Sequence, residues 1–119
     1  MTTKDKRLFS RIDSLNLLSY SCTDDSGQVM VQGMGRTLNV SQGGILLETH
    51  AKIDPKYTIS LTIGLEEDLV DINGDIVHCS PGKDENFESG IQFHKMDEAA
   101  LQILIKYIKA FKEQYGSEL

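Results

Sequence analysis

Apolar and polar residues alternate along most of the chain, and the spacing becomes helical near its end. In 57–65 every second residue is apolar: Tyr57, Ile59, Leu61, Ile63 and Leu65. Alternation with a period of two places these side chains on one face of a β-strand. Five further stretches have strand character: Leu15–Cys22, Gly33–Asn39, Ile45–Thr49, Leu69–Cys79 and Phe87–His94. Six short strands separated by turn residues predict an antiparallel β-sandwich or β-barrel.

A glycine inside the longest of these stretches allows two interpretations. Asn73-Gly74 lies within Leu69–Cys79 and has apolar residues on both sides. An Asn-Gly pair in this setting is typical of a tight type I′ hairpin turn. Glycine within a strand also marks a bend or a bulge, and then the whole stretch is one strand. The residues alone leave both interpretations open.

The chain after Asp97 has the spacing of an amphipathic helix. One apolar stripe is formed by residues three and four positions apart: Leu101, Leu104, Ile105, Ile108 and Phe111. Asp97 is a favourable N-cap, and Gly116 provides a stop, so we expect a helix over about 97–115. Ile103 and Tyr107 widen the stripe, which predicts that the helix also covers a second surface, on the barrel or on a partner. The predicted fold is therefore mostly β, with one packed C-terminal helix.

Length and charge restrict the classes of function. The chain has 119 residues, 39% of them apolar and 25% charged, which fits one folded domain. Twelve basic residues against 18 acidic ones give a net charge of -6. An acidic surface repels polyanions, so we expect no general binding of nucleic acid or of anionic membranes. A local basic site is still compatible with this total.

The termini and the cysteines predict a cytoplasmic protein. No stretch approaches the roughly 20 apolar residues needed to span a bilayer, and the charged N-terminus lacks the apolar core of a signal peptide. Cys22 and Cys79 are the only cysteines. They stand too far apart in the sequence for the closely spaced pairs of a zinc module, and a secreted scaffold usually has more. We expect two reduced thiols, with a single disulfide as the less favoured alternative.

Residues with catalytic or metal-binding potential form no recognisable motif. His50, His78 and His94 are well separated, and the acidic clusters Asp24-Asp25 and 66–68 lie in predicted turns. Such carboxylates are typical of a solvated face rather than of acid–base catalysis. The chain also contains no nucleophile elbow, Walker loop or dinucleotide fingerprint. The sequence predicts neither an enzyme nor a metal site.

Two of the three arginines stand four residues apart near the N-terminus. Arg7-Leu8-Phe9-Ser10-Arg11 places both guanidinium groups on the same side, whether the segment is extended or forms one helical turn. Guanidinium groups bind phosphate or a base edge with two parallel hydrogen bonds and stack on aromatic rings. Considered alone, the pair is more typical of a charged, solvated tail before the first strand.

A polar turn separates two of the predicted strands. Residues 39–44 read Asn-Val-Ser-Gln-Gly-Gly and precede the apolar run Ile45-Leu46-Leu47. Asn and Gly tolerate turn conformations, and short polar side chains bond to nearby backbone. The same turn exposes backbone N–H groups, an amide and a hydroxyl to a ligand. Considered alone, it is a hairpin turn.

Together, the two motifs resemble those of the PilZ domain, a small bacterial β-barrel with a C-terminal helix. Arg7 and Arg11 match the family's Arg-x-x-x-Arg motif, and Asn39, Ser41 and Gly44 match its (Asp/Asn)-x-Ser-x-x-Gly motif. Residues 90–93, Gly-Ile-Gln-Phe, are similar to the family's last strand, and the resemblance covers nearly the whole chain. It implies a six-stranded antiparallel barrel over 14–119 after a flexible tail, residues 1–13. It also implies that Leu69–Cys79 is one strand.

Many PilZ domains bind the second messenger cyclic di-GMP, a dianion with two guanine bases. The resemblance implies that Arg7 and Arg11 engage phosphate and guanine, and that Asn39 bonds a guanine edge. Ser41 and the backbone of Gly43-Gly44 would shape the pocket floor. Lys6 and Gly90 are weaker, supporting candidates. Two departures from the family pattern predict weaker binding: Asn39 stands where Asp is commoner, and Lys6 where a further Arg often precedes the motif.

The implied function is that of a receptor whose tail orders on ligand binding and changes the surface offered to a partner protein. We expect a monomer or a weak dimer, and no cofactor other than the ligand. The alternative is a PilZ-like interaction module that binds no nucleotide. Residues 1–11 hold four basic residues against one acidic, a net charge of +3, whereas the remainder holds eight against 17, a net charge of -9. A cationic tail on an acidic barrel suits the capture of one small dianion.

Overall fold

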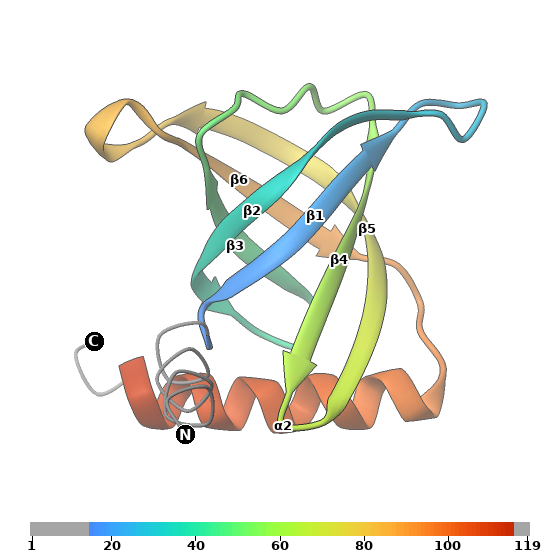
Figure 1. The fold of residues 1–119 in the computed structure, drawn as a ribbon, viewed down its shortest axis with the longest axis vertical. Coiled ribbons are helices and arrows are strands. Elements are labelled where there is room, and N and C mark those ends of the chain that lie inside the picture. The colour runs from blue at the N-terminus through green and yellow to red at the C-terminus, as the bar shows by residue number, and fades with distance from the viewer. Residues whose placement is uncertain (1–14, 116–119) are drawn as a thin grey trace, which may run out of the picture.

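Six antiparallel strands close into a barrel, and one helix runs across an end of it (Figure 1). The computed structural model describes residues 15–115. Its strands are β1 (Leu17–Thr23), β2 (Val29–Val40), β3 (Gly44–Thr49), β4 (Thr58–Leu65), β5 (Asp68–Pro81) and β6 (Phe87–Phe93). A short 3-10 helix, η1 (Lys83–Glu85), precedes β6, and α2 (Glu98–Tyr115) follows it. The order around the barrel is β1-β2-β3-β6-β5-β4, which confirms the predicted fold class.

Strand β2 starts earlier than the predicted stretch Gly33–Asn39. Its first residues, Val29 and Met30, are about half exposed and show no alternation of apolar and polar side chains. They are held in the sheet by pairing with β1, in which Thr23 lies opposite Val29. Backbone pairing therefore extends the strand beyond the residues whose apolar–polar alternation predicts it.

Strand β5 is continuous through Asn73 and Gly74, so the hairpin interpretation of this pair is wrong. Gly74 lies opposite Ile59 of β4 on one side and Phe93 of β6 on the other. A Cβ atom at Gly74 would lie 2.7 Å from the carbonyl oxygen of Gln92. The glycine thus permits a close approach of β6, and that approach rather than a turn accounts for it.

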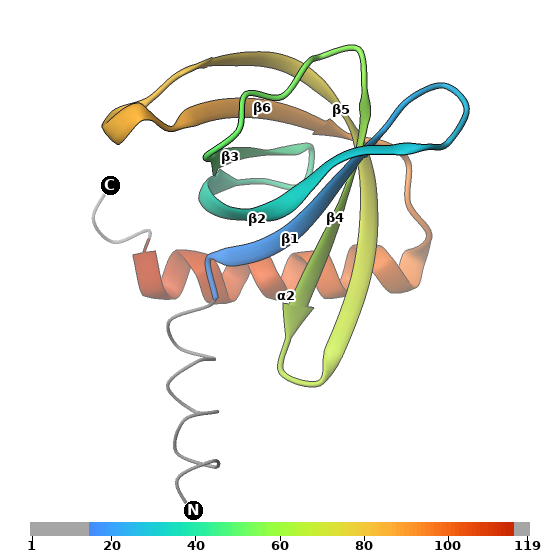
Figure 2. The same cartoon turned by 45° about the horizontal axis from the view of Figure 1, so that its top comes forward.

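The alternating apolar residues fill the barrel. Ile59, Leu61 and Ile63 of β4 are completely buried, as the period-two pattern predicts. Helix α2 lies against the barrel (Figure 2) and buries four side chains, Ala100, Leu104, Tyr107 and Phe111. Removal of these apolar side chains from water stabilises the packing of the helix on the barrel.

The start of α2 is capped as the sequence predicts. The backbone N–H of Ala100 donates to Asp97 Oδ1 at 2.8 Å, which satisfies one of the free donors of the first turn. Gly116, the predicted stop, lies outside the described residues. Of the two residues that widen the apolar stripe, Tyr107 is 1% exposed and Ile103 is half-buried. Since Tyr107 belongs to the core cluster, the barrel is the surface that it covers.

Tyr107 also joins the helix to the start of the barrel. Its hydroxyl donates to the carbonyl oxygen of Leu15 at 2.8 Å and lies 3.0 Å from Thr37 Oγ1. The backbone N–H of Thr37 in turn donates to the carbonyl oxygen of Asn16 at 2.6 Å. Burial raises the pKa of the Tyr107 phenol to about 12. Helix α2, β2 and the residues before β1 therefore share one buried anchor.

Both cysteines are free thiols, so the disulfide alternative is not found. Cys22 is fully buried in β1, and Cys79 on β5 is partly exposed. Burial raises the pKa of the Cys22 thiol to about 11, because the charged thiolate is disfavoured away from water. Cys22 behaves as a small apolar core residue.

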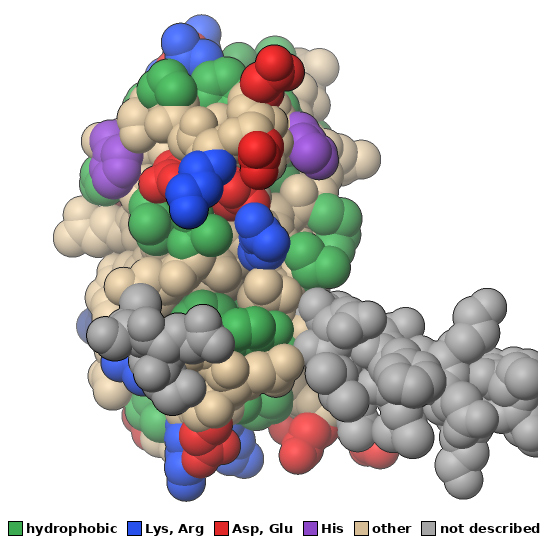
Figure 3. Space-filling model, turned by 90° about the vertical axis from the view of Figure 1, so that its left-hand side faces the viewer, with side chains coloured by type: hydrophobic (Ala, Val, Ile, Leu, Met, Phe, Trp, Pro, Cys, Tyr) green, Lys and Arg blue, Asp and Glu red, His purple; other side chains and the backbone are tan. Residues whose placement is uncertain are grey.

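The described surface carries charges of both signs. On the face in Figure 3, acidic, basic and hydrophobic side chains are interspersed, and no single sign dominates. Such a surface gives no general attraction for a polyanion. A site for an anion must therefore be sought in local geometry.

Candidate functional site

The predicted polar turn connects β2 and β3 and is tied to a third strand. The N–H of Ser41 donates to the carbonyl oxygen of Gly44 at 2.9 Å, and the N–H of Gly43 donates to Ser41 Oγ at 3.3 Å. The N–H of Phe93 on β6 donates to the carbonyl oxygen of Gly43 at 2.9 Å. In the bond from Gly43 the Ser41 hydroxyl oxygen accepts, so its hydrogen can still be donated to a ligand.

The two glycines of this turn have different roles. A Cβ atom at Gly44 would overlap the carbonyl oxygen of Ile91 on β6, whereas one at Gly43 would meet no atom within 4 Å. Gly44 is therefore required by the close approach of β3 and β6, and Gly43 keeps the outer side of the turn open. Both observations fit the expectation that this backbone forms the floor of a pocket.

A β-bulge turns Asn39 outward. Thr37 lies opposite Leu47 and Asn39 lies opposite Leu46, so β2 has one residue more than β3 at this point. Residues two apart in a strand share a face, and without the bulge Asn39 would point into the barrel with the buried Thr37. Asn39 is instead exposed, and its Oδ1 accepts a hydrogen bond from the N–H of Val40 at 2.9 Å.

A second bulge does the same for a residue that the sequence reasoning did not select. On β5, Ile76 lies opposite Ile91 and His78 lies opposite Gly90, so Val77 is the extra residue. Without it, His78 would share the inward face of the buried Ile76. His78 is instead exposed, with its imidazole ring packed over Gly90, where any Cβ atom would overlap it.

These features meet at one open cleft of about 440 Å³ on the outer face of β2, β3, β6 and β5. Its lining includes Asn39, Ser41, Gly43, Gly44 and Gly90, so the structure brings these five predicted site residues together. Val77, His78 and Gln92 also line it. His78 lies far from the turn in the sequence, and only the strand order places it there. No motif in the sequence marks it.

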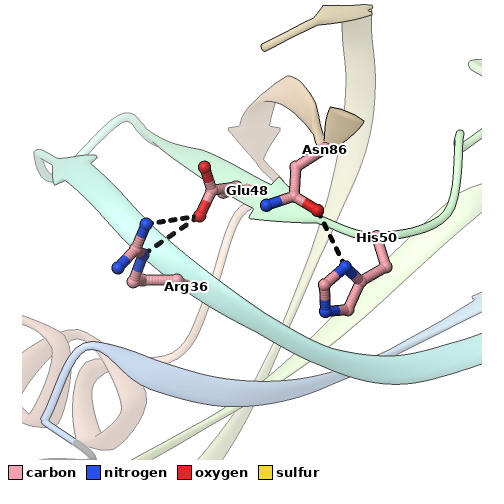
Figure 4. A network of polar contacts seen from close by, with 4 residues as sticks. All are labelled: Arg36, Glu48, His50 and Asn86. Atoms are coloured by element: carbon pink, nitrogen blue, oxygen red, sulfur yellow. Dashed lines mark hydrogen bonds and ion pairs between the residues drawn. The ribbon is translucent and has the colours of Figure 1, made fainter. Parts of the chain in front are cut away.

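The cleft has no charge of its own among the described residues. None of its lining residues is acidic, and none is a lysine or an arginine. Arg36, the one arginine within 15–115, points elsewhere and is paired with Glu48. Its Nε and Nη2 donate to Glu48 Oε1 at 3.0 and 2.7 Å (Figure 4).

A separate hydrogen bond near that pair belongs to the frame of the barrel. His50 Nδ1 lies 2.7 Å from Asn86 Oδ1 (Figure 4), which joins the end of β3 to the residue before β6. Neither residue lines the cleft. His50 is thus a surface residue with a structural contact.

Lys6, Arg7 and Arg11 lie outside the described residues, and so does the whole of the predicted tail, residues 1–13. The described residues do show where that segment joins the barrel. The carbonyl oxygen of Asn16 accepts the N–H of Thr37 on β2, the strand that ends in the polar turn. The N-terminal segment therefore joins the barrel beside β2, the strand that leads to the cleft.

Residues 15–115 contain no group of three or more His, Cys, Asp and Glu side chains placed to hold a metal ion. Within the same residues, no helix has both the length and the apolar character needed to cross a membrane.

Comparison with known proteins assigns the architecture to a family. The sequence model of the PilZ domain matches residues 5–110, a stretch that includes both arginines, the polar turn and the last strand. No curated protein matches the chain. Among solved structures, the crystal structure of the PilZ domain of CeSA from a cellulose synthesizing bacterium is similar, with a TM-score of 0.56 and 12% sequence identity. The alignment covers 81% of this chain and 93% of that one, and at this identity it supports the fold alone.

Proposed function

The chain belongs to the PilZ domain family, and on this basis we propose that it is a bacterial receptor for cyclic di-GMP. The dinucleotide would bind in the cleft on the outer face of β2, β3, β6 and β5. Residues of the N-terminal tail, chiefly Arg7 and Arg11, would close over it. The protein performs no chemistry on the ligand in this proposal. Its output is a change in the surface that it offers to a partner protein.

The observation that carries the proposal is the charge of the cleft. Its described lining contains no carboxylate to repel a dianion and no cation to neutralise one. A dianion therefore needs positive charge from outside the described barrel. Lys6, Arg7 and Arg11 supply that charge, since residues 1–11 have a net charge of +3. Guanidinium groups also bind phosphate with two hydrogen bonds and stack on guanine.

Chain length supports the same arrangement. Ser41 follows Thr37 by four positions, about 13 Å along a strand. Arg11 precedes Asn16, the partner of Thr37, by five positions, and five extended residues span up to about 17 Å. Arg11 can therefore reach the turn without any change in the barrel. Arg7 has four more residues and greater reach.

The polar side chains of the cleft have defined roles in this proposal. The Oδ1 atom of Asn39 already accepts the N–H of Val40, whereas the side-chain NH₂ has two donor hydrogens, so we assign the NH₂ to the base edge. That NH₂ would donate to the O6 or N7 acceptor of guanine. The Ser41 hydroxyl would donate to a phosphate oxygen, and the His78 ring would line the opposite wall. An Asp at position 39 would offer no such donor, so the Asn changes which guanine atoms are bound.

Ordering of the tail links binding to output. Residues 1–13 act as a flexible tail that is fixed over the barrel when both arginines engage the ligand. The ordering costs free energy, which lowers the affinity but changes the exposed surface. A downstream partner protein and a monomeric or weakly dimeric cytoplasmic form belong to the same proposal. An interaction module without nucleotide is the second candidate, and the matching Asn39, Ser41 and Gly44 in one cleft favour the receptor over it.

Isothermal titration calorimetry with cyclic di-GMP tests the proposal. We expect binding by the full chain and at least a several-fold weaker affinity for Arg11→Ala. Lys56→Ala is the matched control, because it removes one positive charge from an exposed lysine that does not line the cleft. Its affinity should equal that of the unmodified chain.

Absence of heat at tens of micromolar protein would reject the receptor and leave the interaction module. Equal weakening by Arg11→Ala and Lys56→Ala would show that net charge, rather than contact by Arg11, governs binding. Either result would contradict the assignment of the arginine motif.

A further inference from the structure

A second hollow on the molecule is larger than the cleft and mostly apolar. It measures about 560 Å³ and lies between the beginning of β1 and the β4–β5 hairpin. Its apolar lining is formed by Leu15, Leu17, Leu18, Met34, Leu65 and Leu69. We call it the β1–β4 groove. None of these residues lines the cleft described above.

Three of the apolar side chains of this groove are open to solvent. Leu17 is 43% exposed, Met34 is 58% exposed and Leu69 is 73% exposed. Of the six large apolar side chains that are prominently exposed among the described residues, three lie in this one groove. Clustered exposed apolar side chains indicate a binding surface, whereas scattered ones need no explanation.

One end of the groove is acidic. Glu66 lines it, Glu67 follows in the same tight turn between β4 and β5, and Asp68 is the first residue of β5. Glu66 has a φ of 58°, so the turn is a sharp one. An occupant that complements this surface has apolar side chains next to basic ones.

The chain's own N-terminal segment has that composition. Residues 1–14 contain Leu8, Phe9 and Ile12 among Lys4, Lys6, Arg7 and Arg11. Leu15, the first described residue, itself lines the groove, so the N-terminal segment joins the barrel at the groove. Phe9 precedes Leu15 by six positions, a span of up to about 20 Å when extended. No second molecule is required to bring apolar and basic groups to this site.

We propose that the β1–β4 groove is the resting position of the N-terminal segment in the ligand-free protein, with Leu8, Phe9 and Ile12 against its apolar lining. The tail remains flexible, because it exchanges between this position and others. The functional consequence rests on the proposed cyclic di-GMP site. Arg7 and Arg11 alternate with the apolar residues, so one short segment cannot occupy the groove and the cleft together. The groove therefore competes with the ligand for the tail.

Hydrogen–deuterium exchange of the full, ligand-free chain tests the resting position without reference to any ligand. We expect the peptide covering residues 1–14 to exchange several-fold more slowly than a synthetic peptide of the same sequence. Met34→Ser should abolish most of this difference. Met30→Ser is the matched control: it is 46% exposed on the same strand, is four positions away and lies outside the groove.

Equal exchange in the unmodified chain and in Met34→Ser would overturn the inference. So would slow exchange that appears only as the protein is concentrated, with a molar mass by light scattering of twice 13.3 kDa. That result would assign the groove to a second copy of the chain. Both outcomes are independent of cyclic di-GMP.

A calorimetric titration of the same variants separates the two proposals. If the groove competes for the tail, Met34→Ser should bind cyclic di-GMP two- to tenfold more tightly than the unmodified chain, and Met30→Ser should not. If Met34→Ser loses the slow hydrogen exchange of residues 1–14 and no variant binds the ligand, the receptor proposal is rejected and the groove proposal is supported. Ligand binding with unchanged affinity in Met34→Ser would support the receptor and contradict the competition.

Discussion

Two single residues decide which side chains reach the candidate site. Leu38 in β2 and Val77 in β5 are the extra residues of two β-bulges. Each bulge moves the side chains of the following residues to the opposite face of the sheet. Asn39 and His78 are outside the barrel for this reason. Bulges of this kind commonly aim side chains at functional sites. The cleft thus depends on two insertions in the strand pairing as well as on the turn between β2 and β3.

At the same scale, the hydroxyl of Tyr107 makes the anchor between α2 and the start of the barrel. Tyr107→Phe removes the donor to the Leu15 carbonyl and the partner of Thr37 Oγ1. We expect the free energy of unfolding to fall by about 1–3 kcal/mol in urea denaturation. Tyr57→Phe, at a half-buried tyrosine, is the control and should change it by less than about 0.5 kcal/mol. Equal effects would mean that the buried hydroxyl contributes nothing specific.

The pKa of Tyr107 adds a pH dependence to this comparison. The phenol ionises near 10 in the unfolded chain and near 12 in the folded one. Between these values the unfolded state loses a proton that the folded state keeps, so stability falls as the pH rises. The phenylalanine variant lacks this loss. The stability difference between the two proteins should therefore shrink by about 1 kcal/mol from pH 10 to pH 11.

Among the elements, the β2–β3 hairpin offers the sharpest comparison. Gly44→Ala would place a methyl group against the Ile91 carbonyl oxygen, while Gly43→Ala would place one in open space. We expect a loss of about 1–3 kcal/mol for the first and a change within about 0.5 kcal/mol for the second. Thermal unfolding of both variants measures this. A similar loss at the two positions would show that the turn, not the β3–β6 contact, requires glycine.

The sequence was sufficient for the elements whose signal is local. The apolar alternation in β4 and the Asp97 cap of α2 are both confirmed, because each depends on neighbouring residues. The extent of β2 and the place of His78 could not be predicted in the same way. Both depend on pairing with strands distant in the sequence. Gly74 shows how a local signal misleads. The Asn73-Gly74 pair is typical of a turn, but Gly74 is needed because β6 lies close to the backbone at this position.

At the scale of the whole molecule, positive and negative charge are separated along the chain. Residues 1–11 have a net charge of +3, and residues 12–119 have a net charge of -9. A small dianion is repelled by the second part and attracted by the first. In the receptor proposal, the position of the positive charges therefore matters more than the net charge of the chain.

Salt dependence of binding tests this point. At higher ionic strength the attraction between tail and ligand is screened, so cyclic di-GMP affinity should fall several-fold from about 0.05 to 0.5 M salt. Lys4→Glu with Lys6→Glu should weaken binding at low salt and flatten this dependence, because the arginines remain but the tail loses its excess positive charge. The matched control is Lys106→Glu with Lys109→Glu, which makes the same change in net charge on the exposed side of α2. A dependence altered equally by both pairs would show that the total charge governs binding and that the tail has no special position.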